Sequence, residues 1–145
     1  MSAHRVMLTA EVISARLRTD LAHALTPKGV IRLCDPYAST ITRDMLQSAA
    51  RRAVKPWVEH LHDCDKQALA LVVECQRRAA RETMPWAVGF LRAAQIRRTP
   101  TRKSPRTDHV FTWFFEGTGA LIISDQTHGT WHAPQEMAAV DFIFG

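Results

Sequence analysis

The sequence changes character once, near residue 97, and this change constrains the fold more than any other feature. Before it, apolar residues recur at helical spacing in several segments. After it, aromatic and β-branched residues dominate in the runs HVFTWFFE, ALIISD, TWHA and MAAVDFIF, with glycines between them. Short runs of this kind bounded by glycine are typical of antiparallel hairpins. We therefore expect an α+β fold with about four helical segments, followed by a C-terminal antiparallel β-meander of three to four strands.

Four segments of the first two thirds carry helical signals. They span Thr9 to Leu25, Thr40 to Lys55, Asp65 to Glu82 and Thr83 to Ile96. In the first, apolar residues recur every four positions. The last contains a single charged residue, so we expect it to be the central core helix, and we expect both Trp57 and Trp86 to be core residues. The run VIRLC, from Val30 to Cys34, is the one short β-like segment before residue 97.

A chain of 145 residues with 46% apolar residues can bury one sizeable core. We expect one α+β domain over 1–145, in which 1–96 is mainly helical, 97–108 is a basic linker and 109–145 is the meander. Neither a signal peptide nor an apolar run long enough for a membrane span is recognisable. The three cysteines are an odd number at irregular spacing, which fits reduced thiols and a cytoplasmic location.

The charge is unevenly distributed. All 19 lysines and arginines lie at or before Arg106, although the net charge is only +5. Eight basic residues near the expected helix ends and in the linker could form one cationic surface: Arg77, Arg78, Arg81, Arg97, Arg98, Arg102, Lys103 and Arg106. Such runs are typical of an anionic partner, and we expect nucleic acid or a nucleoprotein complex first.

The same arginines fit a second hypothesis. Guanidinium groups bind carboxylates as well as phosphates, so the protein could be a protein-binding inhibitor or immunity-type protein, encoded by a phage or plasmid, that acts on an acidic protein surface. The strand HVFTWFFE also has apolar residues on both faces. One face could remain open to an apolar partner or to a second copy of the chain, which would give a homo-oligomer, or both faces could be buried.

The segment VEHLHDCD concentrates possible metal ligands: His60, His62, Asp63 and Cys64. On a helix, His60 and Cys64 share a face and His62 points away, so local spacing supplies two ligands where zinc needs at least three. The alternative is an exposed helix end at which Asp63 or Asp65 caps the following helix. We favour the helix end and expect no cofactor and no metal.

The same segment supports a further interpretation. Leu61-His62-Asp63 followed by Lys66 resembles the core of the HD phosphohydrolases, in which an adjacent His-Asp pair and an outlying His and Asp hold divalent metals. The resemblance implies a metal-dependent hydrolase, with His23 and Asp108 as the outlying ligands. The family's wider pattern is absent from this sequence, so this is the third hypothesis for the function.

No complete catalytic constellation is recognisable. Ser124, Asp125, His128 and His132 lack the Gly-x-Ser-x-Gly elbow of a nucleophilic serine, and the stretch from Asp125 to Gly129 is typical of a hairpin turn with polar residues facing water. Glycine-rich phosphate-binding loops are missing as well. We therefore expect a small non-enzymatic binding protein.

Overall fold

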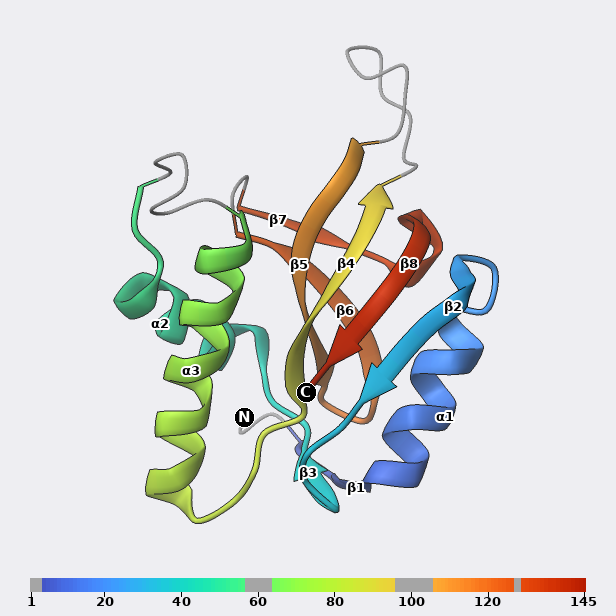
Figure 1. The fold of residues 1–145 in the computed structure, drawn as a ribbon. Helices are drawn as coiled ribbons and strands as arrows, with labels where there is room; N and C mark the ends of the chain where they lie inside the picture. Colours follow the sequence, from blue (N-terminus) through green and yellow to red (C-terminus); the bar gives the residue numbers. More distant parts are fainter. Residues whose placement is uncertain (1–3, 57–63, 96–105, 127–128) are drawn as a thin grey trace.

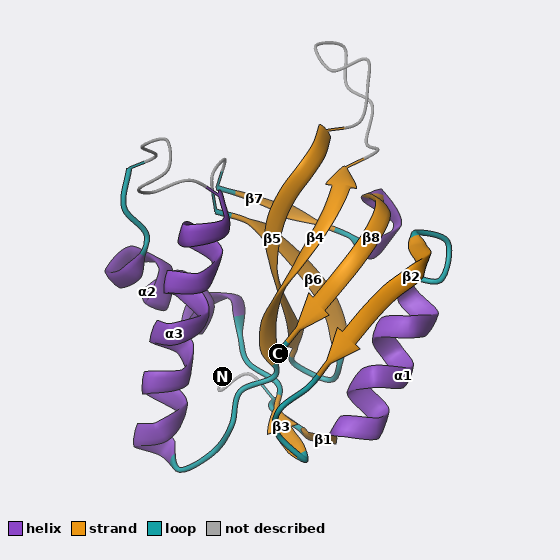
Figure 2. Ribbon diagram, in the orientation of Figure 1, coloured by secondary structure: helices purple, strands orange, loops and turns teal. Residues whose placement is uncertain are grey.

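The computed structural model describes residues 4–56, 64–95, 106–126 and 129–145. These residues form three helices and eight strands, arranged in one six-stranded and one two-stranded sheet (Figures 1 and 2). The helices are α1 (Ala10–Asp20), α2 (Arg43–Ala53) and α3 (Cys64–Glu82). No helix in this described part is long and apolar enough to cross a membrane.

The larger sheet has the strand order β2-β8-β4-β5-β6-β7. β2 pairs in parallel with β8, and the other neighbours are antiparallel. The smaller sheet pairs β1 with β3. The strands are β1 (Met7–Thr9), β2 (Leu25–Arg32), β3 (Tyr37–Ser39), β4 (Val88–Gln95), β5 (Arg106–Glu116), β6 (Ala120–Asp125), β7 (Thr130–His132) and β8 (Met137–Phe144), with a 3-10 turn, η1 (Pro134–Glu136), before β8.

The helices begin where the sequence supplies caps. The hydroxyls of Thr9 and Thr42 accept hydrogen bonds from the backbone N–H groups three residues later, which satisfies donors that a helix start leaves unpaired. Helices α2 and α3 lie on one side of the large sheet and α1 lies on the other (Figure 1). Each side has its own apolar cluster, so the central strands are buried on both faces.

The segment expected to be the central core helix is instead a strand. Residues 88–95 form β4, and their side chains alternate between the clusters, with Val88 and Phe90 on the α3 side and Leu91 and Ala93 on the α1 side. Because both faces are buried, the strand reads as a continuous apolar run, and such a run cannot be distinguished from a buried helix by periodicity. Trp86 is 4% exposed, as expected for a core residue, whereas Trp57 lies outside the described residues.

The expected fold class is therefore wrong. Strands come from the whole length of the chain, and the region before residue 97 contributes β1 to β4 beside its three helices. The strands β5, β6 and β7 do form antiparallel neighbours, but β8 leaves this meander and inserts between β4 and β2. Both faces of β5 are covered, since Phe111 and Trp113 pack with α1 while Phe114 packs with α3. An open aromatic face on β5 for oligomerisation is not found.

Candidate functional site

A histidine and an aspartate form a buried pair where β5 and β6 lie side by side. Nε2 of His109 is 3.0 Å from Oδ1 of Asp125, and the two side chains are only 6% and 3% exposed. The ring of Phe111 lies edge-on to His109, with 4.5 Å between the ring centroids. Burying a carboxylate is costly unless it is paired. The expectation that Asp125 faces water in a hairpin turn is therefore wrong.

A second histidine-carboxylate pair adjoins the first. Nδ1 of His132 is 2.8 Å from Oε2 of Glu136, and Nε2 lies 3.0 Å from the hydroxyl of Thr130. The ring of His132 also packs edge-on to Phe111, at 6.1 Å between centroids. Two imidazoles thus flank one phenyl ring, each held by its own carboxylate. His132 uses both ring nitrogens within its own short segment, which is typical of a structural role.

The helix α3 begins at Cys64, a half-buried residue. The N-terminal end of a helix carries partial positive charge and unpaired N–H groups, which favour a thiolate or an oxyanion placed there. The other two cysteines have different surroundings. Cys34 is exposed, and burial raises the pKa of the Cys75 thiol to about 12, so Cys75 remains a neutral thiol.

Cys64 and His109 lie at the same end of the molecule. Cys75 and Phe114 share one apolar cluster, and α3 and β5 run in the same direction in Figure 1. From Cys75 back to Cys64 the helix rises about 16 Å, and from Phe114 back to His109 the strand extends about 16 Å. By these estimates the start of α3 and His109 lie toward the same end of the sheet, with His109 on the face of β5 that also bears Phe111. The end of β6, whose last residue is Asp125, lies at the same end of the sheet.

An open hollow lies on the sheet face that α3 leaves uncovered. It is lined by Lys28, Phe90, Arg92, Val110, Asp141 and Phe142. The rings of Phe90 and Phe142 are 5.9 Å apart, and Phe142 is 36% exposed. At its edge the Arg92 guanidinium donates to both carboxylate oxygens of Asp141, at 2.5 to 3.1 Å. These hydrogen bonds hold the pKa of Asp141 below its usual value. We call this feature the Phe142 groove.

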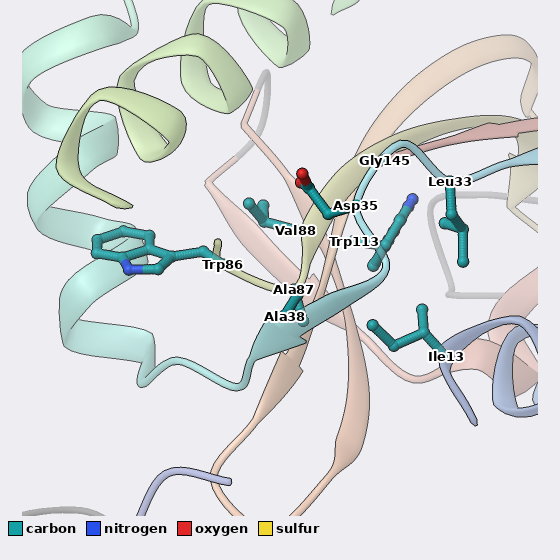
Figure 3. A pocket seen from close by; sticks show the side chains of 9 residues that line it. All are labelled: Ile13, Leu33, Asp35, Ala38, Trp86, Ala87, Val88, Trp113 and Gly145. Atoms are coloured by element: carbon teal, nitrogen blue, oxygen red, sulfur yellow. The ribbon is translucent and has the colours of Figure 1, made fainter. Parts of the chain in front are cut away.

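Two other hollows are not proposed as binding sites. One, beside the chain's C-terminal residue, is lined by apolar side chains and Asp35, and Figure 3 shows Trp113 and Ile13 on opposite sides of the small space. We interpret it as a packing defect. The other lies between α2 and α3, over Trp86, and mixes two arginines with the carboxylates of Asp44 and Glu82.

Three of the eight residues of the expected cationic surface have described side chains: Arg77, Arg78 and Arg81. Arg78 bonds to Glu74 and to Ser48 of α2, and Arg77 also lies near Glu74, while Arg81 lines the mixed-charge hollow beside Glu82. Arg97, Arg98, Arg102 and Lys103 lie outside the described residues, and for Arg106 only the backbone is described. The helix whose end should have carried Arg97 and Arg98 is the strand β4.

Three of the four proposed metal ligands, His60, His62 and Asp63, lie outside the described residues, and Cys64 is the first described residue after them. Among the residues that are described, no group of three or more histidines, cysteines or carboxylates could hold a metal ion. His23, expected as an outlying ligand in the HD-like reading, instead approaches the carbonyl of Met137 at 3.2 Å.

Sequence comparison does not assign the chain to a family. No family model matches it, and no curated protein is significantly similar in sequence. The fold, in contrast, has clear neighbours among solved structures. One is a structure described as the PSL1a-E64 complex, with a TM-score of 0.74 and 18% sequence identity over 96% of this chain. Another is Polyporus squamosus lectin bound to the epitope Neu5Aca2-6Galb1-4GlcNAc, with a TM-score of 0.71 and 14% identity, again over 96% of this chain.

These neighbours define the class of fold, and at such identities they define nothing more. The chain spans about half the length of each neighbour, 51% and 49%. Their descriptions name a lectin with a sialylated glycan and a complex with E64. They contradict the expectation of a nucleic-acid-binding protein or an inhibitor, together with the nucleic-acid and acidic-protein partners that it implied.

The pairing of His109 with Asp125 was missed at the level of sequence, although a signal exists. The turn at Gly117 to Gly119 fixes the register of β5 and β6, with Glu116 opposite Ala120 and Thr112 opposite Ser124. Continuing this register places Asp125 opposite Phe111 and diagonal to His109. Diagonal neighbours on one face of an antiparallel pair can touch when their side chains are long. A hairpin register built outward from the turn would have found the pair.

Proposed function

We propose that this protein is a thiol-dependent hydrolase in which Cys64 is the nucleophile, His109 the general base and Asp125 the residue that orients the histidine. The observation that carries the proposal is the buried His109–Asp125 pair, at the end of the sheet toward which α3 begins. A nucleophile, a base and a group that orients the base are the recurring parts of acyl-transfer sites. The sequence-based expectation of a non-enzymatic protein remains untested.

Each residue has a defined step in this chemistry. His109 takes the proton of the Cys64 thiol, and the thiolate adds to a carbonyl carbon to form a C–S bond. The N–H groups in the first turn of α3 stabilise the resulting oxyanion. The leaving group departs with the proton from His109, and water, deprotonated by His109, then hydrolyses the thioester and restores the thiol. Because Asp125 is paired with Nε2 of His109, Nδ1 is the ring nitrogen that accepts the proton and returns it.

Two further facts support this function. The sequence offers three cysteines in different settings, and only Cys64 lies at a helix N-terminus. One neighbour in fold was solved with E64, an epoxide that alkylates thiolates. A reactive thiol at Cys64 would give this chain the same kind of chemistry.

The test is selective alkylation. We expect E64 at neutral pH to add one label per native chain, at Cys64, as measured by intact mass and peptide mapping. A Cys34→Ser variant should label like the parent, whereas a His109→Gln variant, checked for folding by circular dichroism, should label far more slowly. Equal labelling rates at Cys34 and Cys64, or a His109→Gln rate equal to that of the parent, would contradict the proposal.

A second candidate function is glycan binding, and the Phe142 groove is the observation that favours it. Exposed aromatic faces beside a hydrogen-bonding charged pair are the kind of surface that a sugar ring can contact through its C–H groups and its hydroxyls. One neighbour in fold is a lectin. Titration of this chain with neutral and sialylated oligosaccharides tests it. If no saturable binding is seen up to about 10 mM, the binding free energy is weaker than roughly 3 kcal/mol, and this result would contradict glycan binding.

A further inference from the structure

Three charged residues are among those that line the Phe142 groove: Lys28, Arg92 and Asp141. Arg92 and Asp141 neutralise each other through three hydrogen bonds. Lys28, which lines the same hollow from β2, is exposed and has no ion-pair partner within the described part of the chain. The groove therefore presents one uncompensated ammonium group to a ligand. An anionic group would be attracted to that position.

The aromatic side of the groove is formed by Phe90 and Phe142, and Phe144 packs against both rings. The rings of Phe90 and Phe144 stack at 5.3 Å, and those of Phe142 and Phe144 lie nearly parallel, 6.5 Å apart with 10° between their planes. The rings come from adjacent strands, since Phe90 is paired with Phe144 in the register of β4 and β8. A backbone-anchored surface of this kind loses little conformational entropy when a flat ligand covers it.

The polar side of the groove lies at the edge of that surface. The side chains of Arg92 and Asp141 are 53% and 34% exposed, so a ligand in the groove can reach both of them. A donor and an acceptor side by side match the vicinal hydroxyls of a sugar ring, each of which both donates and accepts. An apolar ligand would leave these groups desolvated without new partners, which is unfavourable.

We propose that the Phe142 groove binds an acidic sugar, with the ring against Phe142, hydroxyls on the Arg92–Asp141 pair and the carboxylate on Lys28. The inference rests on the second candidate function, glycan binding, and deepens it by naming the charge of the ligand. The thiol chemistry of Cys64 is independent of it. An aromatic carboxylic acid has the same negative charge as an acidic sugar and a ring that could lie against Phe142, but it lacks the hydroxyls. It is therefore the alternative ligand for the same groove.

The experiment compares three probes on the full chain by calorimetric titration: sialyllactose, lactose and benzoate. We expect sialyllactose to bind about tenfold tighter than lactose, a difference of about 1.4 kcal/mol, and benzoate to bind more weakly than sialyllactose. A Lys28→Gln variant should lose this preference while still binding lactose. A Phe142→Ala variant should lose both sugars. Lys55→Gln, which removes an exposed lysine outside the groove, is the matched control and should behave like the parent.

The outcomes separate the two levels of the proposal. If neither sugar binds, the glycan-binding function fails. If both sugars bind equally and Lys28→Gln changes nothing, glycan binding stands and the acidic-sugar inference fails. If benzoate binds as tightly as sialyllactose, the groove recognises a flat carboxylate and the sugar assignment is overturned. Raising the salt concentration should weaken sialyllactose binding but not lactose binding, since an exposed charge pair is screened.

Discussion

Nε2 of His109 and Oδ1 of Asp125 lie 3.0 Å apart on neighbouring strands, and both side chains are almost completely buried. A pair of this kind is not needed to close a hairpin, because the backbone ladder between β5 and β6 already does so. Replacing a buried ionic pair by apolar residues is often neutral or stabilising. The thiol chemistry proposed above would give this buried pair a role beyond stability.

The first prediction concerns the stability of this pair. Changing Asp125 to Ala should destabilise the protein by about 3 to 5 kcal/mol, because it leaves a buried imidazole without its carboxylate. Changing both His109 and Asp125 to Ala should cost less than the sum of the single changes, with a coupling of about 0.5 to 3 kcal/mol. Urea unfolding of the four proteins measures this cycle. Strictly additive costs would mean that the two side chains do not interact.

The second prediction concerns the buried thiol of Cys75. Burial raises its pKa to about 12, so at pH 8 it should remain protonated and inaccessible in the folded protein. Its reaction with a thiol-specific disulfide reagent should then follow global unfolding, with a rate that rises with urea, while the exposed Cys34 reacts at once. Rapid modification of Cys75 without denaturant would show that the helix α3 opens locally.

The third prediction concerns Gly89, where β4 passes Trp113. A Cβ added at Gly89 would lie 2.6 Å from Cζ2 of the indole and closer still to the backbone oxygen of Phe144. Since neither a central strand nor a fully buried indole can move freely, Gly89→Ala should destabilise the fold by about 3 kcal/mol or more. Thermal or chemical unfolding tests this. A variant as stable as the parent would require β4 to shift against β8.

The fourth prediction concerns pH. Hydrogen bonds from Arg92, and its positive charge, outweigh partial burial and lower the pKa of Asp141. Because the folded pKa is lower than the unfolded one, the carboxylate adds stability above about pH 4, and this contribution is lost as the pH falls through the folded pKa. The free energy of unfolding should therefore fall more steeply between about pH 4 and pH 2 in the parent than in Asp141→Asn.

The effect will be modest because a third of the Asp141 side chain is exposed, and water screens exposed ion pairs. High salt should reduce the difference between the two proteins. If Asp141→Asn and the parent show parallel stability profiles over this pH range, the hydrogen-bonded pair at the groove does not persist in solution.

Local signals in the sequence found much of the secondary structure. The four-residue spacing from Ile13 to Leu21 lies on α1, and the segment from Asp65 to Glu82 lies on α3. The glycines at 117 and 119 do end β5 and begin β6, and both have positive φ angles that glycine adopts readily. These elements depend on contacts within a few residues, so neighbouring residues suffice to specify them.

The candidate site was harder to find because its members are distant in the sequence. Forty-five positions separate Cys64 from His109, and the arrangement depends on how α3 packs against β5. No spacing rule links a helix start to a strand in the next part of the chain. The Phe142 groove likewise joins residues of β2, β4, β5 and β8, which become neighbours only through the strand order of the sheet.

The sequence by itself determined the helix starts at Thr9 and Thr42, the β5–β6 hairpin and the burial of Trp86. Only the tertiary structure decided that residues 88–95 form a strand and that β8 inserts between β4 and β2. The physical reason is that a short apolar run satisfies its backbone hydrogen bonds equally well within a helix or between strands. The choice is made by the partners that bury it, here β5 and β8 on its two edges and the helices on its two faces.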